Sequence, residues 1–428
     1  MDNFFVEKTR QIVQNKTLPL LLLLWVAVLK WFFEGVLDLA VLELLLLGLG
    51  VGILFLQKWR KKPANLLWAL FSFNIVFSLL THDSTFSVWG QSLITAVIAM
   101  YAVFADGKVI SYRPVVRTLL LIGIGVGAMV MIHMLLGNVF NNLYFPLLTD
   151  KEADMAQNYY NSGYYFGLMY NPHEPAGLIA ISIAGLVLWN LIRNKVDIKV
   201  YAVAAVLLIP LLLTGKKGIF VCLILILTVM VVVWFAIRKQ WRRIWILLLI
   251  VGVGGAAFVL MVMLFPEFSL FKRFHELLAG LLSGESADST RTALYRVAFR
   301  EFKENPLIGI GWRGFNTIVM DKYGFSRGHE VNCDYLQWLC ESGIVGFVLC
   351  LTPVLVTLYR AIRVCVSLVG SEGDHNDTLV IMLSVFIQAF TLIYAFYEIP
   401  FFDIVYFSVY IISCAIINSA YTRRVRKK

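Results

Sequence analysis

The sequence predicts an all-α protein that crosses a membrane about twelve times. Hydrophobic residues make up 60% of its 428 residues and charged residues only 15%, whereas a soluble globular chain is nearer half apolar and a quarter charged. Runs of roughly 20 apolar residues, the length that crosses a bilayer as a helix, recur along the whole chain. Both observations indicate a polytopic integral membrane protein.

The apolar runs define the expected spans and loops. They lie near 17–33, 39–57, 63–80, 87–104, 115–137, 176–192, 200–213, 218–237, 244–265, 344–361, 378–397 and 402–420. We expect nine spans within residues 1–265, with a long loop at 138–175. A large loop domain over 266–343 and a last group of three spans with a basic tail over 344–428 complete the expected organisation.

Basic residues set the expected orientation. Segments such as KWRKK (58–62), RKQWRR (238–243) and RRVRKK (423–428) fall on the same side as the N-terminus when the spans are counted. Cytoplasmic loops of membrane proteins hold an excess of Lys and Arg, so we expect both termini in the cytoplasm. The net charge of +10 therefore indicates membrane topology rather than a nucleic-acid partner.

The large external loop, 266–343, is longer than a turn needs, and long ordered loops commonly carry function. We expect an amphipathic helix in it that begins at Ser289 or Thr290 and ends before Pro306. A second short helix is expected over 330–341, directly before the next span.

Cations on the external side depart from the charge rule. TGKKG (214–218) places Lys216 and Lys217 in a short external turn between apolar runs, where a charge is unfavourable unless it is paired or bound. The 266–343 loop carries further Lys and Arg residues, among them Arg291. Many of these can be solvated charges on an exposed face. Cations beside a membrane also indicate an anionic ligand.

Four stretches, taken together, resemble a known family. They are SGYYFGLMYNPHEPAGLIA (162–180), LLLTGKKGIF (211–220), STRTALYRVAFREFKENPLIGIGWRGF (289–315) and NCDYLQWLCESGIVG (332–346). In this order and topology they resemble the O-antigen ligase and Wzy-type polymerase superfamily of bacterial membrane glycosyltransferases.

The resemblance implies a GT-C-like transferase in the bacterial cytoplasmic membrane. Its donor would be a glycan on undecaprenyl diphosphate, and its acceptor a hydroxyl of a glycan or lipid at the outer face. The resemblance implies no metal and no other cofactor. The arginine of the family's short turn falls on Lys217, with Lys216 beside it, and the loop arginine falls on Arg291. These residues would bind the diphosphate.

Elementary electrostatics supports the binding of a diphosphate by these cations. Breaking a glycosyl–diphosphate bond leaves negative charge on the phosphates, and fixed cations in a water-poor site stabilise it. Lysine in place of arginine loses bidentate phosphate geometry and acts as a point charge.

The family's signature histidine is displaced in this sequence. Its His-Asn pair aligns with Asn332 and Cys333, and His329 lies three residues earlier, about one helical turn away. His329 could therefore receive the acceptor proton, because the pKa of histidine lies near neutral. Glu330 or Asp334 could take that role instead. Positioning alone could also suffice, with His329 acting as a helix cap.

Further polar residues could line a substrate groove. Asn171 and His173 lie at the external start of a span, although a helix cap before Pro175 explains them equally well. Asn332 and Glu341 belong to the signature stretch, where Glu341 more readily forms a structural hydrogen bond than carries a proton.

Three other functions compete with a polymerase that joins repeat units of a surface polysaccharide. A ligase would pass the glycan to lipid A core or another acceptor. A transporter or flippase of an anionic lipid or solute would fit the number of spans, but transporters usually show repeated halves and binding groups near mid-membrane. An inactive homologue would only bind the glycan-lipid.

Overall fold

A computed structural model describes residues 20–24, 47–52, 63–82, 85–104, 109–194, 197–267, 271–283, 289–325, 328–368 and 374–425. Every regular element in these ranges is a helix, as the sequence predicts. Of the spans predicted near 17–33 and 39–57, only residues 20–24 and 47–52 are described, and the rest lies outside the described residues.

The described helices confirm an integral membrane protein. Seven of them are long and apolar enough to cross a membrane: α6 (Arg113–Leu136), α9 (His173–Arg193), α11 (Lys217–Ile237), α12 (Trp241–Leu264), α16 (Asp334–Ser367), α17 (His375–Tyr394) and α18 (Ile404–Arg424). Three helices contain shorter apolar stretches: α4 (Pro63–Thr81), α5 (Phe86–Phe104) and α10 (Ile198–Leu213). Each of the ten overlaps a predicted span, and a total of twelve stays a prediction.

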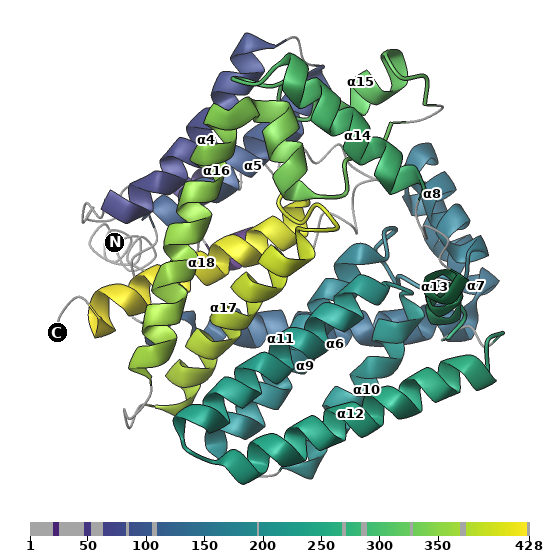
Figure 1. The fold of residues 1–428 in the computed structure, drawn as a ribbon, viewed down its shortest axis with the longest axis vertical. Helices are drawn as coiled ribbons and strands as arrows, with labels where there is room; N and C mark the ends of the chain where they lie inside the picture. The colour runs from purple at the N-terminus through teal and green to yellow at the C-terminus, as the bar shows by residue number, and fades with distance from the viewer. Residues whose placement is uncertain are drawn as a thin grey trace, which may run out of the picture.

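The core of the bundle lies around α18, which is buried along nearly its whole length. It packs against α5, α16 and α17 (Figure 1). One of its buried hydroxyls, Ser419 Oγ, lies 2.9 Å from the hydroxyl of Tyr112. By contrast, α12 lies at the edge of the bundle with most of its apolar side chains exposed, as a lipid-facing helix requires.

The predicted loop domain is helical and has a small apolar core of its own. It contains α13 (Lys272–Ser283), α14 (Ser289–Glu304), α15 (Phe315–Asp321) and the first turns of α16. The predicted amphipathic helix is confirmed as α14, which buries Leu294 and Ala298 against Phe315. The other long loop forms α7 (Asn138–Tyr144), η2 (Phe145–Leu147) and α8 (Asp150–Asn161), and η1 (Val109–Tyr112) precedes α6.

Gly343 lies between the loop domain and the membrane-spanning part of α16. The helix predicted over 330–341 begins at Asp334, and it continues as α16 through a break at Gly343, where φ is 63°. The backbone freed by the break is paired, because Ile344 N donates to Pro306 O at 2.9 Å and Gly311 N donates to Glu341 O at 2.9 Å. The break thus fixes the 306–311 turn against the part of α16 around Gly343.

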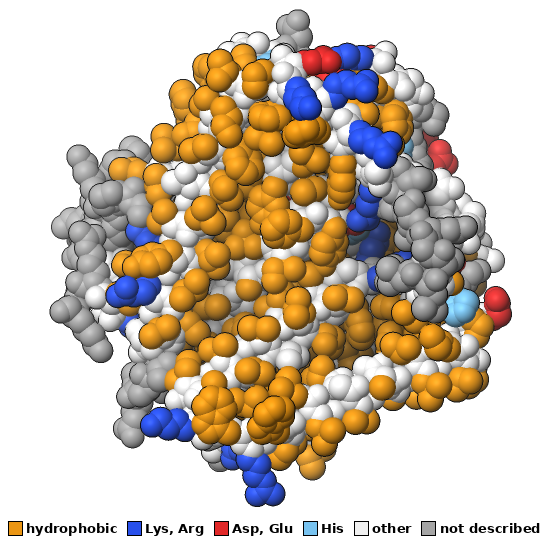
Figure 2. Space-filling view, in the orientation of Figure 1, with side chains coloured by type: hydrophobic (Ala, Val, Ile, Leu, Met, Phe, Trp, Pro, Cys, Tyr) orange, Lys and Arg blue, Asp and Glu red, His pale blue; other side chains and the backbone are white. Residues whose placement is uncertain are grey.

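The chain direction distinguishes the two ends of the bundle. His173 begins α9, Lys217 begins α11 and Tyr394 ends α17, so these residues share one end. Arg193 and Arg238 mark the other end, which is basic as predicted for the cytoplasmic side. Hydrophobic side chains cover most of the face between the ends, with Lys and Arg near its edges and in a recess (Figure 2). The orientation itself stays a prediction.

Candidate active site

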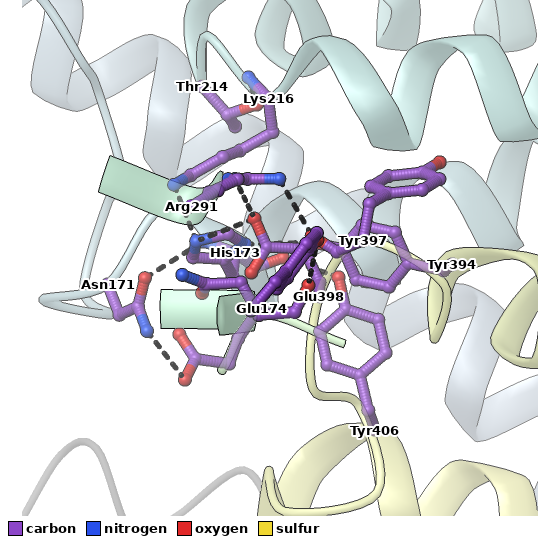
Figure 3. A network of polar contacts seen from close by, with 12 residues as sticks. Asn171, His173, Glu174, Thr214, Lys216, Arg291, Tyr394, Tyr397, Glu398 and Tyr406 are labelled. Carbon is purple, nitrogen blue, oxygen red and sulfur yellow. Dashed lines mark hydrogen bonds and ion pairs between the residues drawn. The ribbon is translucent and has the colours of Figure 1, made fainter. Parts of the chain in front are cut away.

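A polar network centred on His173 lies where α9, α11, α14 and the α17–α18 loop meet (Figure 3). His173 Nδ1 lies 2.7 Å from the hydroxyl of Tyr394, and Nε2 lies 2.6 Å from Lys216 Nζ. The hydroxyl of Tyr406 donates to the main-chain oxygen of His173 at 2.7 Å. Tyr394 of α17 and Lys216 of the turn before α11 therefore fix this imidazole, and Tyr406 of α18 fixes its main chain; the sequence placed His173 only in a possible groove.

Lys216 reaches His173 from the turn between α10 and α11. The turn depends on Gly215, which has a φ of 65° that side-chain-bearing residues rarely adopt. Lys216 Nζ lies 5.4 Å from the ring centroids of both Tyr159 and Tyr164, within the range of a cation–π contact. The two tyrosine rings thus form an aromatic wall beside the ammonium group.

Arg291 brings the second cation from α14. Its Nη2 lies 3.1 Å from Glu398 Oε1, and its Nη1 donates to Tyr397 O at 2.9 Å. Glu398 Oε1 also lies 3.9 Å from His173 Nε2. Glu398 is therefore the carboxylate that links Arg291 to the His173–Lys216 pair, and these side chains are only partly buried.

Tyr397 fixes this loop against the start of α11. Its hydroxyl donates to Gly218 O at 2.9 Å, and its ring lies where a Cβ on Gly218 would be. Burial is the main reason that the pKa of Tyr397 is raised, so the phenol stays protonated and keeps donating. The contacts of Tyr397 with Gly218 thus fix the position of the adjacent Glu398.

The hydrogen bonds indicate the protonation state of His173. A lysine ammonium has only donors, so Nε2 accepts from Lys216 and the imidazole is neutral with its proton on Nδ1. This tautomer is assigned from its partners. The site accordingly offers two cations, one carboxylate between them and one imidazole nitrogen occupied by a cation. Such a set can bind an anion that displaces the carboxylate.

The predicted carboxylates of the signature stretch lie in a second cluster. Glu341 is fully buried and accepts from Arg313 N at 2.7 Å, Phe315 N at 3.3 Å and Gln337 Nε2 at 3.1 Å. Gln337 also donates to Glu330. Burial raises the pKa of Glu330, while Arg313 and Gln337 oppose that shift. Glu341 thus has the structural contacts that the sequence favoured for it.

Asp334 is also fully buried. Its Oδ2 accepts from Phe401 N at 3.0 Å, and its own main-chain N donates to Ala395 O at 2.9 Å. Asp334 therefore connects the start of α16 to the loop that carries Glu398. This is a positioning arrangement, and a catalytic role for Asp334 stays a prediction.

The remaining predicted residues lie around these two clusters. The ring of His329 packs edge-on against Phe325, with centroids 5.6 Å apart. Asn332 adopts a φ of 56°, which Asn tolerates, and its carbonyl accepts from the hydroxyl of Tyr295. Asn171 Oδ1 accepts from His173 N at 3.2 Å and so orients the start of α9. Lys217 follows Lys216 as the first residue of α11.

The sequence did not assign Glu398 and Tyr394 to the site. Tyr394 is the last residue of α17 and Glu398 lies in the loop after it, and neither belongs to a sequence motif. Within the described residues, no group of three or more His, Cys, Asp or Glu side chains could hold a metal ion. The expectation of a reaction without a cofactor stays a prediction.

Comparison with known proteins supports the sequence resemblance. Residues 201–351 match the family model described as O-antigen ligase, which confirms the resemblance over this part of the chain. The match includes Lys216, Lys217 and Arg291 and ends within α16. His173 and Glu398 lie outside it. No curated protein matches the chain.

Proposed function

We propose that the protein transfers a glycan from an undecaprenyl-diphosphate carrier to an acceptor hydroxyl at the outer face of the cytoplasmic membrane. The observation that carries the proposal is the convergence of Lys216 and Arg291 on His173 and Glu398 at one membrane end. Two cations at this level can bind the headgroup of a donor whose lipid tail stays in the bilayer. The family match over residues 201–351 supports this class of reaction.

The donor diphosphate takes the place of Glu398 between the cations. Its oxygens accept hydrogen bonds from Arg291 and Lys216, and Lys217 at the start of α11 adds positive charge. The bond between the anomeric carbon and the diphosphate oxygen breaks with its electron pair on the oxygen. Lys216 and Arg291 stabilise that developing charge because they are fixed before the reaction.

His173 is our first candidate for the group that receives the acceptor proton. When Lys216 turns to the diphosphate, Nε2 becomes available to an incoming hydroxyl, while Tyr394 keeps the ring oriented through Nδ1. The acceptor oxygen forms a bond with the anomeric carbon, and its proton passes to Nε2. His329, Glu330 and Asp334 remain the alternatives from the signature stretch.

Our first candidate acceptor is a second lipid-linked repeat unit, which would make the protein a polymerase of surface polysaccharide, because Lys217 stands where the family's short turn has an arginine. A ligase that uses lipid A core or another acceptor is the second candidate, favoured by the description of the matching family as O-antigen ligase. Transport of an anionic lipid or solute fits less well, because the polar network lies at the ends of the helices rather than at their middle.

Incubation of the purified protein with an undecaprenyl-diphosphate-linked repeat unit tests the proposal. A ladder of longer lipid-linked chains would establish a polymerase. Transfer only to an added lipid A core acceptor would establish a ligase. A donor that binds and stays intact with every acceptor supplied would contradict the proposed reaction.

A further inference from the structure

An apolar groove runs along the outside of the bundle between α11, α16 and α17, which lie side by side in Figure 1. Its volume is about 860 Å³. Leu225 and Val229 on α11 and Val366 on α16 line it and are about half exposed. In a membrane these side chains face lipid, so the groove is open to the bilayer.

One end of the groove carries a cation. Arg238, the residue after α11, lines the groove together with Trp234, and its guanidinium carbon lies 4.0 Å from the indole centroid. α11 is about 30 Å long, so Arg238 lies at the membrane boundary opposite to Lys216. Three more cations follow, Lys239 in the turn and Arg242 and Arg243 in the first turn of α12.

Arg238 has a positive neighbour rather than a negative one. In the part of the chain that the structure describes, no carboxylate forms an ion pair with Arg238, and its pKa is lowered by desolvation first and by the charge of Arg243 second. Arg243 is itself hydrogen-bonded to Asn194 and Gln240. Arg238 is an exposed guanidinium beside an apolar surface, and at a membrane boundary such a cation is stabilised by an anion.

We propose that this groove binds a glycerophospholipid with one anionic phosphate, of the phosphatidylglycerol type. Its acyl chains lie against the apolar walls and its phosphate accepts hydrogen bonds from Arg238. Basic sites between membrane helices are typical for anionic headgroups on the cytoplasmic side. The tail of the glycan donor is the other lipid to consider. On α17 the groove reaches Ile393, next to Tyr394, but along α11 it begins at Leu225, roughly 12 Å from Lys217, and its charged end at Arg238 is the far one.

Native mass spectrometry of the purified full chain tests this inference. The protein is mixed with phosphatidylglycerol and phosphatidylcholine of matched acyl chains, and the retained lipid is identified as detergent is removed. Wild type should retain phosphatidylglycerol at least about tenfold over phosphatidylcholine, and Arg238→Gln should abolish that preference. Arg238→Lys should preserve it partly. Arg242→Gln, at an exposed residue in the first turn of α12 that does not line the groove, should retain the full preference.

A groove-filling variant covers the possibility that Arg238→Gln misfolds. Val229→Trp places a large ring on the exposed wall and should reduce retention of phosphatidylglycerol while unfolding at the wild-type temperature. Equal retention of both lipids by wild type would overturn the inference. So would an undiminished preference in Arg238→Gln, or displacement of phosphatidylglycerol by undecaprenyl phosphate at equal concentration.

Discussion

Lys216 Nζ lies 2.6 Å from His173 Nε2, so a cation occupies the imidazole nitrogen that would otherwise be available as a base. The two residues lie 43 positions apart in the chain, and the start of α9 and the turn before α11 bring them together. A donor diphosphate that attracts Lys216 would release this nitrogen at the moment when an acceptor hydroxyl needs it. In the proposed reaction, donor binding and base activation would therefore be linked through one side chain.

Replacement of Lys216 should affect turnover strongly. Lys216→Ala removes one of two cations that stabilise the leaving diphosphate, so we expect kcat/KM for transfer to fall about 10²- to 10³-fold. Lys216→Arg keeps the charge and should remain within about tenfold of wild type. Lys199→Ala, at an exposed residue near the opposite end of α10, is the matched control and should leave kcat/KM unchanged. Normal turnover by Lys216→Ala at equal membrane levels would remove Lys216 from the mechanism.

Neutralisation of Glu398 should strengthen binding of the leaving group. Glu398→Gln frees Arg291 from its ionic partner, so the product undecaprenyl diphosphate should inhibit transfer with a Ki about tenfold lower. Glu304→Gln changes an exposed carboxylate on α14 and serves as the control. An unchanged or higher Ki for Glu398→Gln would show that Glu398 does not compete with the diphosphate.

The hydroxyl of Tyr394 should act on the chemical step rather than on binding. Tyr394→Phe leaves the ring in place and removes the partner of His173 Nδ1, so we expect kcat to fall about tenfold with KM within twofold of wild type. Steady-state kinetics with varied donor separates the two parameters. A rise in KM with normal kcat would assign Tyr394 to substrate binding. The parallel variant His329→Ala tests the residue that the signature stretch favoured.

Replacement of Gly343 by alanine should lower the stability of the protein. A Cβ at this position would overlap the main chain of Leu307, and the φ of 63° disfavours any other residue. Gly343→Ala should therefore lower the free energy of unfolding by about 1–3 kcal/mol, measured as a lower midpoint in thermal unfolding. Gly254→Ala, within α12 and with open space around its Cα, should have little effect. Equal midpoints for the two variants would contradict the role of the break.

The membrane helices could be predicted from composition because a bilayer demands long apolar segments, and the ten described helices that overlap predicted spans follow from that single rule. The break at Gly343 could be placed only between the predicted short helix and the span. Its φ depends on packing against the 306–311 turn, which no local pattern reveals.

The site was predictable only in part. Lys216 and Arg291 stood out because cations are unusual beside an external membrane surface. Glu398 and Tyr394 did not, because their significance comes from contacts across 107 and 221 positions of the chain. His173 looked like the start of a helix, and its place at the centre depends on three other elements. Local sequence therefore indicated the charges but not how they are paired.

Donor binding tests the central claim most directly. Equilibrium binding of undecaprenyl diphosphate and undecaprenyl monophosphate is compared for wild type, Lys216→Ala, Arg291→Ala and Arg296→Ala, whose residue is exposed on the same helix as Arg291. We predict that wild type and Arg296→Ala prefer the diphosphate, and that Lys216→Ala and Arg291→Ala each bind it at least about tenfold more weakly and lose the preference. Unchanged diphosphate affinity in both of those variants would contradict the claim that Lys216 and Arg291 together bind the donor headgroup.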